Sequence, residues 1–89
     1  MEKWKLENYA NKAYCHSICN KEELENAKKC GCFYCLKIYD TSQIKEWIEE
    51  ETGLKTAICP YCGIDAVIAE STDYELCDEL LAYMYSIWF

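Results

Sequence analysis

The sequence predicts a small α+β fold, and three features of its 89 residues support this prediction. Apolar residues recur at helical spacing near both ends of the chain, as in Leu80, Leu81 and Met84. Short runs of β-branched and apolar residues lie between these segments. Two Cys-x-x-Cys pairs, at 32–35 and 59–62, bracket the middle of the chain. We therefore expect helices at both ends and a core of short strands that carries the cysteines.

The first two helices are predicted before the first cysteine pair. Residues 2–14 place apolar side chains at helical spacing. Asn20, followed three residues later by Glu23, is the pattern of a helix N-cap with a capping box. Cys30 and Gly31 should end this second helix, because glycine favours the position after a helix C-cap.

A third helix is predicted between the two cysteine pairs. Asp40, with Gln43 three residues later, again has the pattern of a capping box. Gly53 marks the expected end of the helix. One face of this helix would carry three apolar side chains: Ile44, Trp47 and Ile48.

Three short strands and a last helix complete the predicted fold. Residues 36–39, 55–58 and 64–68 alternate or are rich in β-branched side chains, which favours strands. The last helix should begin near 71–73 and run close to the C-terminus. Its expected core face consists of Cys77, Leu80, Leu81, Met84, Ile87 and Trp88.

Composition and charge limit the classes of partner. Nine basic residues stand against sixteen acidic ones, which gives a formal net charge of −7. Nucleic-acid-binding domains use clusters of lysine and arginine to neutralise phosphates, and the longest basic run here is Lys28-Lys29. The first residues contain no apolar stretch typical of a signal peptide, and no run approaches the roughly 20 apolar residues that span a bilayer. We therefore expect a cytoplasmic protein with reduced thiols, no membrane contact and no nucleic-acid partner.

The cysteines predict a metal site that stabilises this short chain. A domain of this size buries only about 60% of the surface exposed by its unfolded form, and usually needs a further constraint. In a reducing compartment that constraint is metal ligation rather than a disulfide. Cys32, Cys35, Cys59 and Cys62 form two knuckles, and together they can supply a closed tetrahedral site of four thiolates that leaves no position for a substrate. We therefore predict that residues 1–89 form a single zinc-binding domain with a zinc-ribbon-like core and one structural Zn²⁺.

Redox chemistry is an alternative, because the CPYC sequence at 59–62 is also the active-site tetrapeptide of glutaredoxins. A redox motif opens a helix whose N-terminus lowers the pKa of the first thiol, and that fold uses a further proline downstream. Here Gly63 and a strand-like run follow the motif, and Pro60 is the only proline in the chain. We therefore interpret CPYC as half of a metal site, with unliganded thiols or a disulfide as the remaining alternative.

The other four cysteines and the single histidine are left with open roles. Cys30 precedes the first pair by two residues and is a rival ligand, although its spacing is long for a knuckle. Cys77 is expected to be a buried apolar residue of the last helix. Cys15 and Cys19 share a helical face, and a second metal site with His16 would need further ligands. A surface or capping role is the simpler interpretation of His16.

Three strings in the sequence are distinctive: CGCFYC at 30–35, TAICPYCGID at 56–65 and the final Trp-Phe at 88–89. In these strings the sequence resembles a family of small bacterial cytoplasmic proteins of unknown function. It implies a zinc-ribbon-like core at the two cysteine pairs and implies no activity. Ala66 and Thr41 depart from the family pattern, in which serine and proline are expected.

The expected function is that of a small intracellular structural-zinc module that binds another protein. Eight tyrosines and three tryptophans favour this hypothesis, since these residues dominate interface hot spots, although they can also fill a small core. One alternative is an inhibitor encoded by a phage or mobile element, an acidic decoy against a nucleic-acid enzyme. A second is a metal-associated hydrolase or nuclease that uses His16 and Asp65, but one histidine and scattered carboxylates are a weak basis for catalysis. We therefore expect no catalytic residues. Self-association through Tyr85 and Phe89 of the last helix is a further prediction.

Overall fold

Three helices and five short strands make up the α+β fold that the sequence predicts. The computed structural model describes all residues from Met1 to Phe89. In chain order the elements are α1 (Lys3–Tyr14), a 3₁₀ turn (Cys15–Ser17), α2 (Lys21–Glu25), β1 (Lys29–Cys32), β2 (Ile38–Asp40), a second 3₁₀ turn (Thr41–Gln43), β3 (Glu46–Glu49), β4 (Lys55–Ile58), β5 (Val67–Ala69) and α3 (Asp78–Trp88). None of the helices combines the length and apolar character that crossing a membrane requires.

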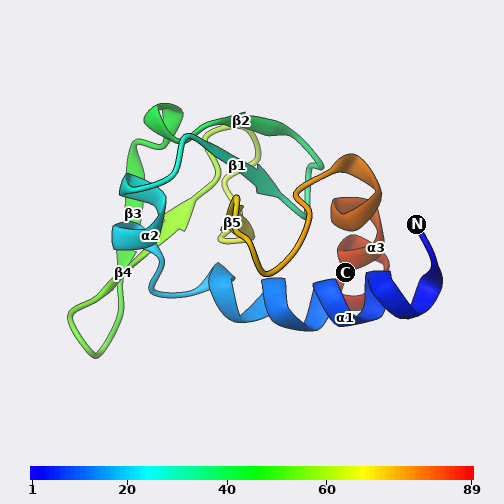
Figure 1. Ribbon diagram of the computed structural model, residues 1–89. Helices are drawn as coiled ribbons and strands as arrows, with labels where there is room; N and C mark the ends of the chain where they lie inside the picture. The colour runs from blue at the N-terminus through cyan, green and yellow to red at the C-terminus, as the bar shows by residue number, and fades with distance from the viewer.

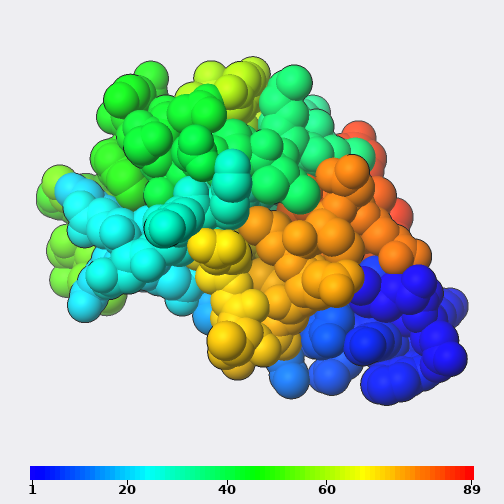
Figure 2. Space-filling view, turned by 45° about the horizontal axis from the view of Figure 1, so that its top comes forward, coloured from blue at the N-terminus to red at the C-terminus, as the bar shows by residue number.

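The strands form two separate antiparallel sheets. One has three strands in the order β2-β1-β5, and the other is the β3–β4 hairpin. The hairpin and α2 lie at one end of the molecule, and α3 and the start of α1 lie at the other (Figure 1). The space-filling view shows the same division, with α1 in blue at one end and α2 and the hairpin in cyan and green at the other (Figure 2). No strand pairing joins the two sheets, so other contacts must hold them together.

The core lies between α1, α3 and the strands β1 and β5. Leu80, Leu81 and Met84 of α3 are fully buried, as the helical pattern predicts. Gly31 of β1 lies so close to this helix that an added Cβ would be 3.0 Å from Cδ1 of Leu81. Ile87 is 47% exposed, so its predicted place on the core face is wrong.

The helix predicted between the cysteine pairs is wrong, because this segment forms β3 of the hairpin. The predicted capping box at Asp40 produces only a short 3₁₀ turn. Gly53 adopts a φ of +86° and reverses the chain, which lets 55–58 pair with 46–49. Backbone pairing across the hairpin therefore overrides the helical spacing of the apolar residues.

The second helix is much shorter than predicted and ends at Glu25. Asn20 precedes it, but its side chain makes no capping bond and lies buried instead. The residues expected to end the helix, Cys30 and Gly31, belong to β1. The predicted last helix begins later than expected, at Asp78.

The strand predictions agree more closely with the structure. The range 55–58 matches β4 in full, whereas β2 and β5 occupy only the later parts of the ranges 36–39 and 64–68, each extending one residue further. The residues left out of these strands belong to the two cysteine loops, where the backbone turns sharply.

Candidate metal centre

The first cysteine pair lies in a tight loop between β1 and β2. The amide of Cys32 donates a hydrogen bond to the carbonyl of Lys37 at 3.0 Å, and the amide of Leu36 donates to the carbonyl of Cys32 at 2.8 Å. The amide of Tyr34 donates to the sulfur of Cys32 at 3.4 Å. The loop thus aims backbone donors at a sulfur, which is the arrangement that stabilises a thiolate.

The second cysteine pair, between β4 and β5, has the same backbone pattern. The amide of Cys59 donates to the carbonyl of Ile64 at 3.0 Å, and the amide of Gly63 donates to the carbonyl of Cys59 at 2.9 Å. Both loops therefore close with hydrogen bonds at the same relative positions. Two knuckles of like geometry thus face one another, the first within the three-stranded sheet and the second in the connection between the two sheets.

Each loop places the residue after its second cysteine in the left-handed backbone region. Gly63 has a φ of +77°, and Leu36 has a φ of +66°. Glycine adopts this conformation without a steric penalty, whereas a leucine in it destabilises the fold by about 1–2 kcal/mol. Glycine is the residue expected at such a position, but nothing in the local sequence identifies Leu36.

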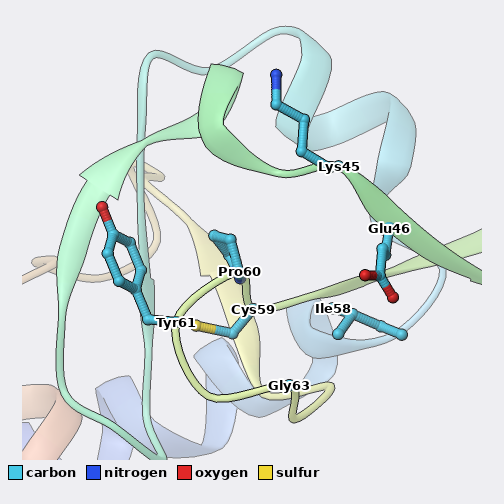
Figure 3. A pocket seen from close by; sticks show the side chains of 7 residues that line it. All are labelled: Lys45, Glu46, Ile58, Cys59, Pro60, Tyr61 and Gly63. Atoms are coloured by element: carbon cyan, nitrogen blue, oxygen red, sulfur yellow. The ribbon is translucent and has the colours of Figure 1, made fainter.

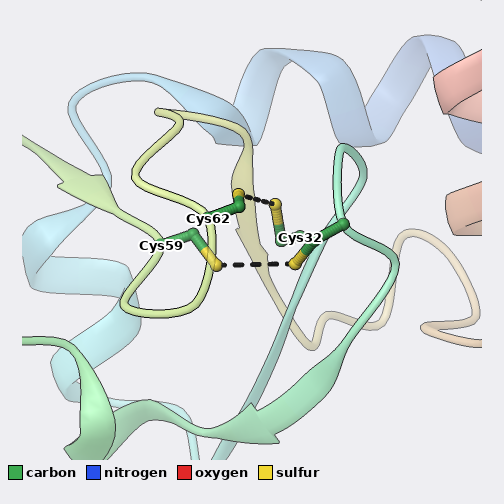
Figure 4. Close-up of side chains that lie close together, drawn as sticks. Cys32, Cys59 and Cys62 are labelled. Atoms are coloured by element: carbon green, nitrogen blue, oxygen red, sulfur yellow. Dashed lines mark hydrogen bonds between the residues drawn. The ribbon is translucent and has the colours of Figure 1, made fainter.

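The four sulfur atoms of Cys32, Cys35, Cys59 and Cys62 lie within 4.8 Å of one another. The sulfurs of Cys32 and Cys62 are 3.6 Å apart, and those of Cys35 and Cys59 are 3.7 Å apart. These distances are far beyond the roughly 2 Å of a disulfide, and all four cysteines are free. Figure 4 shows the thiols of Cys32, Cys59 and Cys62 gathered between the two loops.

The sulfur separations fit a single tetrahedral metal ion. Four sulfurs placed about 2.3 Å from a central ion would be about 3.8 Å from one another, close to the two shortest separations in the cluster. The structure therefore brings the predicted ligands together in an arrangement that can hold a metal ion. Such an ion would also connect the two sheets through their loops.

Burial and hydrogen-bond donors act differently on the cysteines of the cluster. Burial raises the pKa of Cys32 and also that of Cys62. For Cys59, burial acts to raise the pKa, but the Tyr39 hydroxyl and the amides of Tyr61 and Cys62 face the sulfur and lower it overall. A metal ion must displace the protons of the thiols that it binds, so its affinity should fall as the pH falls.

An open cavity of about 360 Å³ lies beside the second loop. Pro60 and Tyr61 of the loop line one side, and Lys45 and Glu46 line the other (Figure 3). Cys59 also contributes to the lining.

The remaining cysteines lie outside the four-cysteine cluster, which is the only group of three or more cysteine, histidine or carboxylate side chains close enough to share an ion. Cys30 is buried, its thiol donates to the carbonyl of Tyr39 at 3.6 Å, and burial raises its pKa to about 12. Cys15 is exposed, and Cys19 has a φ of +53° at the end of a turn. Cys77 is half-buried and precedes α3, so its predicted place as a buried residue within the last helix is wrong. The structure thus provides no second group that would support another metal ion.

His16 lies between two carboxylates, and Asp65 makes no contact with it. Nδ1 of His16 is 2.7 Å from an oxygen of Glu23, and Nε2 is 3.5 Å from an oxygen of Asp73. The imidazole also packs edge-on against Tyr74. Asp65 is exposed and forms no hydrogen bond or ion pair with His16.

Tyr39 is a residue of the site that the sequence interpretation missed. Its ring is buried, and its hydroxyl faces the sulfur of Cys59. The alternation of the β2 segment is compatible with an inward Tyr39, but only the folded chain places it beside the second loop.

Comparisons with protein-family models, with curated proteins and with solved structures found no match to this chain, so the family resemblance stays a prediction.

Proposed function

We propose that this chain is a small protein-binding module stabilised by one structural zinc ion at Cys32, Cys35, Cys59 and Cys62. Four thiolates in a tetrahedral arrangement favour zinc among the common divalent ions. All four positions around such an ion would be occupied by protein, so the metal would stabilise the fold without binding a substrate.

The observation that carries the binding role is a continuous cluster of six aromatic rings that extends from the first cysteine loop to α1 and α3. Phe33 of the loop is buried at its centre. Tyr14 stacks on Trp88 with ring centroids 4.2 Å apart, and Phe33 lies within 6.4 Å of both rings. We call these residues the aromatic cluster: Tyr14, Phe33, Tyr34, Tyr85, Trp88 and Phe89.

One edge of the aromatic cluster is exposed to solvent. Tyr34 is 40% exposed, Tyr85 is 41% exposed and Phe89 is 53% exposed. The three rings contact one another, with centroids between 4.8 and 5.7 Å apart. Contiguous exposed aromatic side chains are typical of protein interfaces rather than of free surfaces.

One of the exposed rings belongs to the same loop as two of the candidate metal ligands. Tyr34 lies between the two cysteines of the first pair, so a metal ion that fixes this loop would also fix the position of its ring. The net charge of −7 favours a partner with a basic surface, because complementary charge speeds encounter and excludes acidic competitors.

Paired surface variants test the binding role. A double variant, Tyr34→Ser with Phe89→Ser, removes two exposed rings of the aromatic cluster. A control, Trp4→Ser with Leu54→Ser, removes two exposed apolar side chains located elsewhere. Affinity capture from the source cells should recover a stoichiometric partner with the unaltered chain and the control, but not with the aromatic variant.

Native mass spectrometry of the same samples measures the bound metal. One zinc ion per chain is expected for all three proteins, because neither variant alters a cysteine. Recovery of the same proteins by both double variants would contradict the binding role. A zinc content other than one per chain would contradict the metal site.

A further inference from the structure

A buried tyrosine beside the cysteine cluster has a hydroxyl with no partner. Tyr39 lies at the centre of β2 and is 4% exposed. Its hydroxyl is the only buried side-chain nitrogen or oxygen in the molecule that lacks a hydrogen bond. An unpaired buried hydroxyl destabilises a fold, and phenylalanine would fill the same volume without that penalty. The hydroxyl therefore requires an explanation.

Neighbouring residues hold the Tyr39 ring toward the sulfur atoms. Tyr39 of β2 pairs with Cys30 of β1, and the Tyr39 carbonyl accepts a hydrogen bond from the Cys30 thiol at 3.6 Å. Its ring packs edge-on against Tyr61 of the second loop, with centroids 5.2 Å apart. The hydroxyl faces the sulfur of Cys59, and the thiols of Cys30 and Cys32 lie nearby.

We propose that Tyr39 is a positioning residue of the metal site, and that its hydroxyl donates a hydrogen bond to the Cys59 thiolate of the metal-bound protein. This inference rests on the proposed zinc site. A neutral thiol is a weak acceptor for the Tyr39 hydroxyl. A thiolate is a strong acceptor, and metal binding creates one at this position.

The charge of the site gives this hydrogen bond its role. Four thiolates around one divalent ion carry excess negative charge, and Cys32 and Cys59 are withdrawn from water. Backbone amides already face these sulfurs, such as that of Tyr34 at Cys32. The Tyr39 hydroxyl would be the one side-chain donor among them, and it would hold the Cys59 sulfur in position while reducing its donation of charge to the metal.

The test compares Tyr39→Phe with a matched control, Tyr74→Phe. Tyr74 is also 4% exposed, but its hydroxyl donates to the carbonyl of Ala69 and not to a sulfur. Zinc affinity, measured by competition with a chromogenic chelator, should fall about 10–100-fold for Tyr39→Phe. The control loses a structural hydrogen bond, so affinity alone does not separate the two roles.

Absorption spectra of the cobalt-substituted proteins distinguish a role at the metal site from a purely structural role. The sulfur-to-cobalt charge-transfer band of Tyr39→Phe should move to lower energy, because the sulfur lone pairs lose a stabilising donor. The band of Tyr74→Phe should stay where it is in the unaltered protein. An unmoved band in Tyr39→Phe overturns the proposal, whether or not the affinity falls.

A measurement on the unaltered chain covers the case in which Tyr39→Phe does not fold. With ¹¹³Cd in the site, the hydroxyl proton of Tyr39 should show scalar coupling to the metal through the Cys59 sulfur. A hydroxyl proton without such coupling overturns the proposal. Failure of the unaltered chain to bind one metal ion would instead refute the zinc site itself.

Discussion

Replacing Asn20 by aspartate should strongly destabilise the protein, because this side chain joins three separate parts of the fold. Asn20 is 3% exposed. Its amide nitrogen donates to the carbonyls of His16 at 2.9 Å and Val67 at 2.8 Å, and its oxygen accepts from the amide of Ala57 at 3.0 Å. Aspartate keeps the volume and the acceptor but has no N–H donor, so two carbonyls would lose their partner and face a carboxylate.

The structure sets the magnitude of this effect. Each buried group left without a partner costs about 1–3 kcal/mol, so two carbonyls give about 2–6 kcal/mol. Domains have a total free energy of unfolding of about 5–15 kcal/mol, so the variant should be only marginally stable. Asn26→Asp is the control, because the Asn26 side chain is exposed and water can replace its bond to Glu22. The free energy of unfolding of the control should fall by less than about 1 kcal/mol.

Urea unfolding followed by circular dichroism measures both changes. The free zinc concentration must be the same in all samples, because metal binding adds to the free energy of unfolding. If Asn20→Asp unfolds at the same urea concentration as Asn26→Asp, then the buried hydrogen bonds of Asn20 do not stabilise the fold as argued.

Three further predictions concern the backbone and the metal. Gly63→Ala should lower the free energy of unfolding, measured in urea, by about 1–2 kcal/mol, because its φ is +77° and strain in the backbone is the only cost of a Cβ there. Gly53→Ala in the hairpin should lower it by a similar amount, but only Gly63→Ala should alter the spectrum of the cobalt-substituted protein. Gly31→Ala should lower the free energy of unfolding by about 1–3 kcal/mol, because the added Cβ would lie 3.0 Å from Cδ1 of Leu81 and 3.1 Å from Cδ1 of Leu76. The loss should be smaller in a Leu76→Val background, which removes one of these atoms, and an additive double-mutant cycle would contradict this close packing. Removal of zinc by EDTA should unfold the chain, since structural zinc contributes about 10–16 kcal/mol; native circular dichroism without bound zinc would contradict a structural role.

Local spacing was sufficient to predict the candidate metal residues. The two Cys-x-x-Cys pairs each need only a tight loop, and such a loop is determined by residues close together in the chain. Gly63 has an equally local origin, because glycine is the residue that favours a positive φ. Local reasoning missed Leu36, because a leucine with positive φ is held by the loop's hydrogen bonds and has no signature in the sequence.

The segment between the cysteine pairs shows where local reasoning failed. Ile44, Trp47 and Ile48 have helical spacing, but Trp47 pairs with Ala57 in the hairpin and Ile48 is 37% exposed. Ile44 is nevertheless buried and Trp47 packs against the core, so the pattern identified two core contacts but assigned them to the wrong kind of element. A hairpin partner that lies beyond the turn at Gly53 decided the structure, and helix periodicity contains no information about it.

The role of Asn20 depends on residues that are distant in the chain. Its capping-box pattern is genuine as a local signal, since α2 does begin directly after it. The side chain nevertheless bonds to Val67, 47 residues away, rather than to the first turn of the helix. Tyr39 and Cys59 likewise meet only because two sheets converge, so neither interaction could be predicted from the sequence.

The matching geometry of the two cysteine loops has a consequence for how the protein folds. Each loop closes through hydrogen bonds between residues no more than five positions apart, so each can form before the rest of the chain is ordered. At a large excess of zinc, both loops can each capture an ion of their own, and one ion must then dissociate before the loops can share the other. Refolding should therefore be fastest near one zinc ion per chain and slower above it, which makes the supply of metal a determinant of folding rate as well as of stability.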